Sequence, residues 1–539
     1  MRARTKRNIL IAAGYAAVMA VGLMLGPKLV RENQNTRNGS FISFGNSGRA
    51  AKVEQVIQII NENYVDSVKL DTVQDLAIQE ILKRLDPHSA YLPPAEAQIL
   101  SDDLEGNFNG IGIEYYMLND TLLITSVNHG GPAFKAGIQH GDRILAINKK
   151  PIAGIRINSK KVIEQIRGKR GSAVELLVKR DNIHKNFLVK RDRILVSSID
   201  AAYLIDNQNA YVKISKFGAQ TDEDFHNSLV KLKKQGMKNL ILDLRDNGGG
   251  YLNSATALAD EFLKDQELIV YTEGLHEPRT DYYAGPKGEF EQGKLVILIN
   301  ENTASASEIV AGAVQDLDRG TIIGRRSFGK GLVQEQFDFG DGSALNLTIA
   351  RYYTASGRSI QKPYKKGNDA YFNELNERYQ SGELNVGSEE IRDSLYHKSK
   401  TYTTRSGKVL YGGGGIMPDI YIPVDTSAHT DLFFSLSAKG VLNDMLYNYL
   451  VKYDWKYTKV DDLIRSFNLS NQDLKVLGML AASKKIKLNE QQLKRSMPLI
   501  KSQLMALMAR YYFGDEGFYK TLNSGDRAVS QSLEVLSSL

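Results

Sequence analysis

Short apolar runs that alternate with helical patterns constrain the fold of this chain more than any other sequence feature. Residues 240–244, 295–299 and 321–324 are strongly apolar, and the first two are each followed by a turn and a helical pattern. Strands buried on both faces have near-continuous apolar sequences. Strands that alternate with helices build a parallel sheet with helices on its faces. The sequence therefore predicts an α/β core.

The length of 539 residues predicts several domains, because one domain holds roughly 100–200 residues. Helical patterns come first, with Asp71 as the expected N-cap of a second helix. The strand patterns within residues 333–353, separated by a glycine-rich turn, predict a hairpin. The regions that we predict are an N-terminal helical region (51–104), a β-rich module (105–192), a core (193–426) with a polar insertion at 364–410, and a helical region (427–539).

The N-terminus has the pattern of a membrane anchor. Residues 9–26 carry no charge and are mostly apolar, and basic residues precede them: Arg2, Arg4, Lys6 and Arg7. A helix of about 20 apolar residues spans a bilayer, and a basic flank stays cytoplasmic. We therefore predict an anchor in residues 1–30 and a linker at 31–50, with the rest of the chain in the periplasm or otherwise outside the cytoplasm. A cleaved signal peptide is the alternative.

Composition excludes several classes of site. The chain has no cysteine, which excludes disulfides, zinc ribbons, iron–sulfur clusters and a cysteine nucleophile. Its 8 histidines form no H-E-x-x-H motif, and no glycine-rich loop ends in the Gly-Lys-Ser/Thr of a P-loop. The 69 basic and 62 acidic residues are spread along the chain, which argues against nucleic acid as a partner. We expect no metal and no cofactor.

A serine nucleophile remains. No G-x-S-x-G motif is present, although spacing alone does not exclude a Ser–His–Asp triad. A buried lysine of lowered pKa can serve as the base instead. The pattern Ser-x-x-Lys carries no weight alone, because it occurs about as often as chance would give: Ser228/Lys231, Ser327/Lys330 and Ser359/Lys362.

Ser305 is the best candidate nucleophile. It stands where the strand predicted at 295–299 turns into a helix, among small residues that would let a substrate backbone approach. The amide of Ala306, at the helix N-terminus, is placed to donate to an oxyanion. The alternative is that Ser305 is only an N-cap, a role for which serine is preferred.

Ser305 also lies within a long motif. The sequence T-A-S-A-S-E-I-V-A-G-A-V-Q-D begins at Thr303, and G-R-R-S-F-G-K-G-L-V-Q ends at Gln334. These segments closely resemble the C-terminal processing peptidases, also called tail-specific proteases, which are serine–lysine proteases with a ClpP/crotonase-like core. Shorter matches follow the family's order at residues 85–92, 243–250, 347–361 and 415–419, so that the agreement spans about 53–423.

The resemblance implies a fold and assigns catalytic roles. The fold would be multidomain α/β, with a protease core, an inserted PDZ domain, N-terminal helices and a C-terminal helical region. Ser305 would be the nucleophile, Lys330 the general base and Gln334 the residue that orients the lysine. The oxyanion hole would combine the amide of Ala306 with that of Gly249 or Gly250, and the sequence leaves this choice open.

The chain departs from the family pattern at several places. Ser327 stands where threonine is more common, and only the weak Ser-x-x-Lys pattern makes it a rival nucleophile. Gly248 stands where proline is frequent, and the insertion at 364–410 is absent from many members.

Residues 105–192 resemble a PDZ domain. Gly110, Ile111, Gly112 and Ile113 look like its carboxylate-binding loop, in which successive amides form a nest for a terminal carboxylate. The strand at 111–114 would then accept a peptide as an added strand. In isolation, the same glycines would indicate a plain turn.

The implied function is a serine endopeptidase that cleaves proteins near their C-termini, with the PDZ domain capturing the tail. Its partners would be protein or peptide substrates with free C-termini and, through the N-terminal helix, the membrane; a homo-oligomer or an adaptor protein stays open. One alternative is a catalytically silent PDZ adaptor. Another is a Ser/Lys acyltransferase acting on peptidoglycan, for which the accompanying penicillin-binding motifs are missing.

Overall fold

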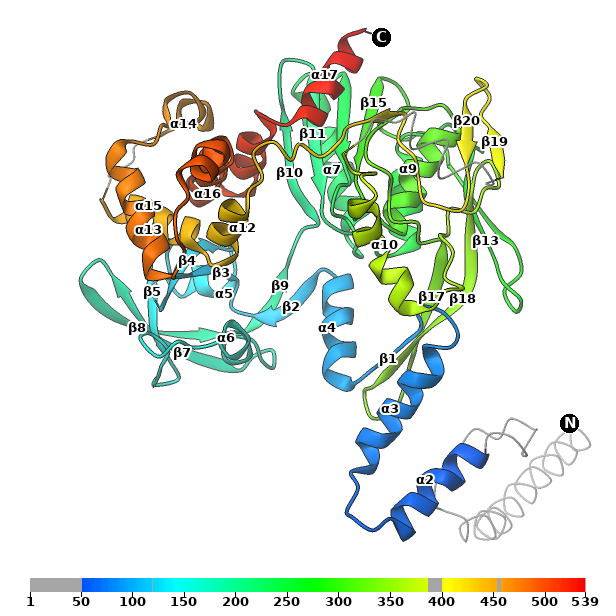
Figure 1. Cartoon of the computed structure of the whole chain (residues 1–539), viewed down its shortest axis with the longest axis horizontal. Helices are drawn as coiled ribbons and strands as arrows, with labels where there is room; N and C mark the ends of the chain where they lie inside the picture. The colour runs from blue at the N-terminus through cyan, green and yellow to red at the C-terminus, as the bar shows by residue number, and fades with distance from the viewer. Residues whose placement is uncertain (1–50, 119, 386–399, 453–456, 539) are drawn as a thin grey trace, which may run out of the picture. The chain divides into compact units, whose positions relative to one another are not determined.

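The computed structural model describes residues 51–538 apart from 119, 386–399 and 453–456 (Figure 1). The chain divides into two units, Met1–Ala77 and Ile78–Leu539, and the second contains the predicted core and the PDZ-like module. The predicted N-terminal helices are confirmed as α2 (Ala51–Asn63) and α3 (Leu70–Leu82). Because α3 begins at Leu70, Asp71 lies in its first turn and is not the N-cap that we expected.

The predicted membrane location is contradicted by the structure. Across residues 51–538, with the gaps given above, no helix is long and apolar enough to cross a bilayer. The stretch at 9–26, on which the prediction rested, lies outside the described residues. The prediction used the hydropathy of one short segment, and no described element supports it.

The core is a six-stranded sheet that confirms the α/β class. Its strands follow the order β10 (Ile199–Leu204), β11 (Asn209–Ile214), β12 (Asn239–Asp243), β15 (Lys294–Ile299), β16 (Thr321–Gly324) and β21 (Ile420–Tyr421). Neighbouring strands are parallel except for β10 and β11. Side chains of β12 and β15 are buried on both faces, which explains their continuous apolar sequences.

Helices cover both faces of this sheet. On one face, α7 (Thr221–Lys234), α8 (Leu252–Asp260) and α9 (Ala306–Asp316) share an apolar core with the strands. On the other face, Val529 and Leu536 of α17 (Arg527–Ser538) pack with Val296 and Ile323. The last helix of the chain is therefore part of the core sheet's packing, although its sequence continues the C-terminal helical region.

A second sheet contains the predicted hairpin, formed by β17 (Leu332–Asp338) and β18 (Ala344–Thr354). β18 also pairs with β1 (Ala90–Leu92) and with β13 (Leu268–Glu273), which in turn pairs with β14 (Thr280–Tyr283). The polar insertion contains a helix, α10 (Asn368–Gln380), and a ribbon of β19 (Thr401–Thr403) and β20 (Val409–Tyr411). It is therefore structured where it is described.

The module at 105–192 folds around its own apolar core. Its sheet has the order β3 (Ile113–Leu118), β4 (Thr121–Val127), β5 (Arg143–Ile147), β7 (Ala173–Arg180) and β8 (Ile183–Lys190), and β6 (Lys150–Pro151) pairs with β5. Two helices, α5 (Pro132–Lys135) and α6 (Ser159–Ile166), complete it. A ribbon of β2 (Asn107–Gly110) and β9 (Asp192–Leu195) lies where the chain enters and leaves. Among the described strands, β3 pairs only with β4, so one edge of β3 has no strand partner.

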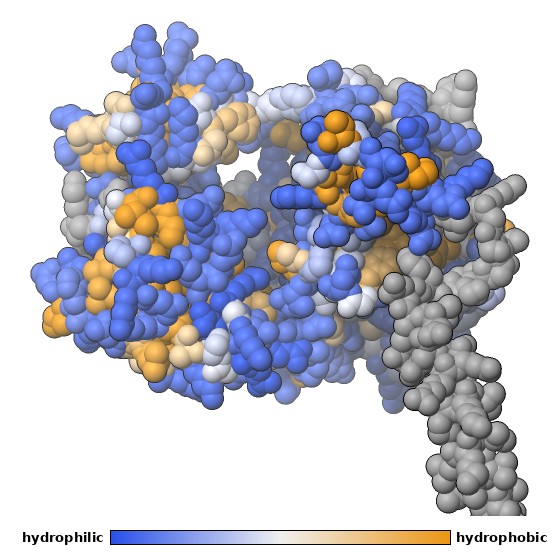
Figure 2. All heavy atoms as spheres, turned by 90° about the horizontal axis from the view of Figure 1, so that it is seen from below, coloured by the Kyte–Doolittle hydropathy of each residue, from blue (hydrophilic) through white to orange (hydrophobic). Residues whose placement is uncertain are grey.

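The helices before α17 form a separate apolar core. They are α12 (Asp431–Ala438), α13 (Val441–Lys452), α14 (Val460–Ser466), α15 (Asn471–Ser483) and α16 (Glu490–Asn523). At Gly514 the backbone of α16 leaves the helical conformation, with φ 68° and ψ −164°. Beyond this kink, Tyr519 and Asn523 donate to Asp200 and Tyr203 of β10. The face seen in Figure 2 is mostly hydrophilic, with apolar areas broken up by polar side chains.

Candidate active site

Ser305 lies at the turn between β15 and α9, where the sequence predicts it. Its backbone has φ 56° and ψ −118°, and a sparsely populated conformation of this kind costs about 1–3 kcal/mol. The turn is held by its neighbours: the Thr303 hydroxyl donates to the Leu244 carbonyl, and the Ala304 amide donates to the Asn247 carbonyl. The strained serine is therefore fixed against the loop that follows β12.

Glu308, a residue that the sequence analysis did not single out, joins the Ser305 turn to the loop before β17. Its buried carboxylate accepts from the amides of Ser305 (2.8 Å), Gly329 (2.8 Å) and Lys330 (2.9 Å), and from the Ser327 hydroxyl (2.5 Å). Burial raises the pKa of Glu308 to about 7, although these hydrogen bonds favour the carboxylate. The Ser-x-x-Glu spacing of a capping box was the one signal in the sequence.

Lys330 occupies a tight loop between two glycines. Gly329 has φ 88°, and a Cβ at this position would lie 3.0 Å from the Gly415 amide nitrogen, so the loop requires glycine. Within the described part of the chain, the Lys330 amine has no hydrogen-bond or ion-pair partner. Burial lowers the pKa of Lys330, and the negative charges of Glu308 and Asp86 only partly oppose this. An amine whose pKa is lowered is unprotonated, and so able to accept a proton, at a lower pH than an ordinary lysine.

Gln334 lies in β17 at an irregularity in its pairing with β18. The register shift places Gln334 opposite Thr348. The Gln334 Nε2 donates to Thr348 Oγ1 (3.1 Å), and Thr348 Oγ1 donates to Asp86 Oδ1 (3.1 Å). The structure therefore directs the amide nitrogen of Gln334 to Thr348 and not to the lysine.

The segment 86–89 and helix α10 support the lysine loop. Burial lowers the pKa of His88 to about 4, and its Nε2 lies 2.9 Å from the Tyr371 hydroxyl of α10. Arg378, also on α10, donates to the Arg326 carbonyl (2.7 Å). No local sequence pattern indicates that the polar insertion would contribute to this site.

Ser327, the rival nucleophile, is fully buried. Its hydroxyl donates to Glu308 and accepts from the Ile416 amide (2.6 Å). It does not line the cavity that contains Ser305. The contacts of Ser327 are those of a residue that joins loops.

Some backbone amides beside Ser305 already donate to an acceptor within the described residues, and others do not. Gly249 packs against the serine, because a Cβ there would lie 2.8 Å from the Ser305 Cβ. Its amide already donates to Asn247 Oδ1 (2.9 Å). The amides of Ala306 and Gly250 donate to no acceptor in the described part of the chain. These two amides are therefore available to a developing oxyanion.

One cavity of about 680 Å³ is lined by Ser305, Lys330, Gln334 and the residues that carry the two free amides. Its polar lining includes the side chains of Ser305, Lys330 and Gln334 and the backbone at Ala306 and 248–250, together with Ser101, Asp103, Ser215, Lys216, Gln336 and Asn346. Apolar side chains of the core and of α4 (Pro94–Leu104) form much of the rest: Leu100, Leu104, Leu252, Ile309, Leu332 and Val333. A hydroxyl, an amine without a partner and uncommitted amides in one cavity are the components of acyl transfer.

The PDZ-like module offers its own anion site. Ile111 and Gly112 are buried, and their amides donate to no acceptor in the described residues. Arg167, which the sequence analysis missed, follows α6; its Cγ lies 4.0 Å from the Cβ position of Gly110, and its guanidinium stacks 4.2 Å from the Phe108 ring. The loop therefore combines free amides with a nearby cation beside the edge of β3 that faces away from β4.

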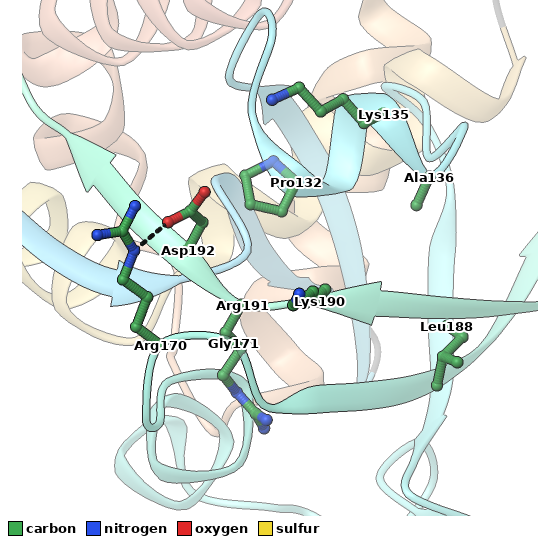
Figure 3. Close-up of a pocket in the computed structure, with 9 residues that line it drawn as sticks. All are labelled: Pro132, Lys135, Ala136, Arg170, Gly171, Leu188, Lys190, Arg191 and Asp192. Atoms are coloured by element: carbon green, nitrogen blue, oxygen red, sulfur yellow. Dashed lines mark hydrogen bonds and ion pairs between the residues drawn. The ribbon is translucent and has the colours of Figure 1, made fainter.

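A separate hollow of about 490 Å³ lies on the same module (Figure 3). Arg170 and Asp192 form an ion pair at 2.6 Å in its wall, and Leu188 and Lys190 of β8 line it as well. It shares no lining residue with the cavity around Ser305.

Comparison with known proteins identifies the parts of this chain. Residues 208–367 match the model of peptidase family S41, and residues 109–190 match the PDZ domain. Residues 432–514 match a family of unknown function. The chain is 27% identical to a photosystem II D1 C-terminal processing protease, with a TM-score of 0.32 over 57% of this chain and 88% of that one.

Sequence relatives agree with these matches. The chain is 33% identical over 356 residues to a carboxy-terminal-processing protease of Bartonella bacilliformis, covering 65% of this chain and 81% of the relative. It is 34% identical over 313 residues to a probable CtpA-like serine protease of Staphylococcus aureus, covering 57% of this chain and 62% of the relative. The chain therefore belongs to peptidase family S41, among the carboxy-terminal-processing proteases, and is a serine-type peptidase.

Proposed function

We propose that this chain cleaves protein substrates near their C-termini, with Ser305 as nucleophile, Lys330 as general base and Gln334 as the residue that orients the lysine. The observation that carries the proposal is the shared cavity, in which the serine and an amine without a partner among the described residues lie together. Burial supports the base role, because it lowers the pKa of Lys330 and a base must be unprotonated to act.

In the first half of the reaction, the Lys330 amine takes the hydroxyl proton of Ser305 while Oγ attacks the scissile carbonyl. Negative charge develops on the carbonyl oxygen, and the amides of Ala306 and Gly250 donate to it. The protonated Lys330 then gives its proton to the leaving amine, and an acyl-enzyme remains. In the second half, Lys330 activates a water molecule that hydrolyses the acyl-enzyme and restores Ser305.

We assign the second oxyanion amide to Gly250 and not to Gly249. The Gly249 amide would have to leave Asn247, and that hydrogen bond lies in a buried part of the loop. Gly249 instead acts as a spacer, because any side chain there would collide with Ser305.

Gln334 is proposed to orient Lys330 through its carbonyl oxygen. Thr348 engages the Nε2 of Gln334, which leaves Oε1 to accept from the amine. Thr348 is in turn held by Asp86, so the orientation of the amide is fixed from behind.

We assign capture of the substrate tail to the PDZ domain. The free amides of Ile111 and Gly112 would bind the terminal carboxylate, Arg167 would supply a counter-charge, and the edge of β3 that faces away from β4 would pair with the peptide backbone.

Tail recognition predicts a preference for a free carboxylate. A peptide should bind the full chain about tenfold more tightly as the free acid than as the amide, because hydrogen bonds to a charged group contribute about 1.5–3 kcal/mol. The Ser305→Ala variant should be used to prevent cleavage, with calorimetric titration as the measurement. Arg167→Gln should reduce the difference in affinity between the free-acid peptide and the amidated peptide. Equal affinity for both peptides in the parent would contradict the assignment.

The alternative function is a catalytically silent PDZ adaptor. It is disfavoured because the strained Ser305 and a buried lysine without a partner both lower stability, and an adaptor gains nothing from either. A fluorophosphonate probe tests the choice. We expect it to label the intact chain at Ser305, as identified by peptide mapping. An unlabelled chain that still binds tail peptides would favour the adaptor.

A further inference from the structure

We propose that Asp526, near the C-terminus, is a positioning residue for the loop at 246–250 that holds the oxyanion glycines. This inference rests on the proposed function, because it concerns the placement of the Gly250 amide. Asp526 lies 281 positions from Arg245, its partner at the start of that loop, and beyond the 432–514 segment whose family has no known function.

The contact joins two elements through one guanidinium. Arg245 Nη1 donates to Asp526 Oδ2 (2.7 Å), while Nε and Nη2 donate to the Asp243 carboxylate at the end of β12 (3.0 and 2.5 Å). The side chains of Arg245 and Asp526 are only 19% and 24% exposed. A planar guanidinium held on two sides has one orientation, so the backbone of Arg245 is fixed where the loop begins.

Asp526 is itself held in place. Its Oδ1 accepts from the amides of Ala528 (2.8 Å) and Val529 (3.2 Å), which caps α17. Helix α17 packs on the core sheet, and Lys294 of β15 donates to the Leu536 carbonyl near the other end of the helix (2.8 Å). Asp526 therefore presents Oδ2 to Arg245 from a fixed helix terminus.

The loop needs such an anchor because of its composition. Three successive glycines occupy 248–250, and glycine restricts the backbone less than any other residue. At the far end, the Phe217 amide donates to the Gly249 carbonyl, and the Tyr251 amide donates to the Phe217 carbonyl. At the near end, the Arg245 side chain acts beside two further contacts: the Asp246 amide donates to Asn300 Oδ1 (2.9 Å), and the Asn247 carbonyl accepts from the Ala304 amide. Loosening Arg245 should let the Gly250 amide depart from its productive position without unfolding the loop.

The Asp526→Asn substitution tests whether Asp526 positions the loop at 246–250, and it should change helix α17 little. Asparagine caps helices as well as aspartate, so Oδ1 can still accept from the α17 amides. The group facing Arg245 becomes an NH₂ donor, which cannot accept from the guanidinium. We expect kcat for a cleavable peptide to fall about tenfold or more with KM within about twofold, since loss of one oxyanion donor lowers kcat about 10²–10³-fold. Affinity for a peptide boronate, which forms a tetrahedral adduct, should fall in parallel, while affinity for the product peptide should not change.

Lys294→Met is the matched control. It removes a contact at the other end of α17 and leaves Asp526 and Arg245 in place. We expect the kcat of Lys294→Met to equal that of the parent. Thermal melting curves should show that Asp526→Asn and Lys294→Met are both folded. The inference is overturned if Asp526→Asn turns over normally, if Lys294→Met shows the same loss, or if boronate and product affinities fall equally. If Ser305→Ala retains activity, the proposed function fails instead, which separates the two failures.

Discussion

Replacing Ser305 with alanine is expected to lower kcat for peptide cleavage by a factor on the order of 10⁴ to 10⁶, because the acyl-enzyme is proposed to form on the Ser305 hydroxyl. The fold should persist, because the side chain removed is small and the turn is held by Thr303, Ala304 and Glu308. Steady-state hydrolysis of a peptide ending in a free carboxylate, with circular dichroism as the check on folding, measures both.

Ser327→Ala is the matched control for Ser305→Ala. This substitution also changes a serine to alanine, but Ser327 lies in the neighbouring loop and does not line the cavity. We expect a loss of about 1–3 kcal/mol in stability, because the Ile416 amide is left without its acceptor. Its kcat should stay within about tenfold of the parent, since the Ser305 hydroxyl is untouched. An inactive Ser327→Ala beside an active Ser305→Ala would reverse the assignment of the nucleophile.

The second large effect is expected at Lys330. Lys330→Arg should abolish cleavage, because a guanidinium keeps its proton at any working pH and cannot act as a base. Lys330→Met should be equally inactive. In the parent, activity should rise with pH as the amine loses its proton, with an inflection below the usual lysine pKa of about 10.4, since burial lowers the pKa of Lys330. Substantial activity in Lys330→Arg would exclude the general-base role.

The pH dependence of protein stability should show whether Lys330 is neutral or ion-paired in the folded chain. Between the folded and the unfolded pKa of Lys330, the unfolded chain binds a proton that the folded chain does not. The stability of the parent therefore falls as the pH is lowered from about 10 towards the folded pKa, and this contribution is constant below it.

Lys330→Met lacks the amine and therefore this pH dependence. As the pH is lowered over the same range, the melting temperature of Lys330→Met should rise relative to that of the parent. Glu308, with its pKa raised to about 7, remains in both proteins and affects the comparison mainly near neutral pH. A Lys330→Met variant that is much less stable than the parent at every pH would show that Lys330 stabilises the fold as an ion-pair partner.

Local sequence was sufficient for the elements that depend on neighbouring residues. The apolar runs of β12 and β15 predicted buried strands because a strand covered on both faces needs apolar side chains on both sides. The position of Ser305 at a strand-to-helix turn was predicted correctly, because a strand, a short polar turn and a helix occur in succession around it. The glycine loop at 110–113 was different, because its glycines alone would indicate a plain turn and only the resemblance to a PDZ domain suggested a carboxylate-binding role.

Tertiary structure decided whatever depends on residues far apart in the chain. The sequence left Gly249 and Gly250 open as the oxyanion glycine, and our proposal of Gly250 rests on the Asn247 side chain, which accepts from the Gly249 amide. It placed Gln334 near Lys330 but not the Thr348 and Asp86 contacts that hold the amide of Gln334. Periodicity reports which side of an element is buried and not what buries it. The pairing of Arg245 with Asp526 and the support of the lysine loop by α10 therefore emerged only once the sheet had brought these segments together.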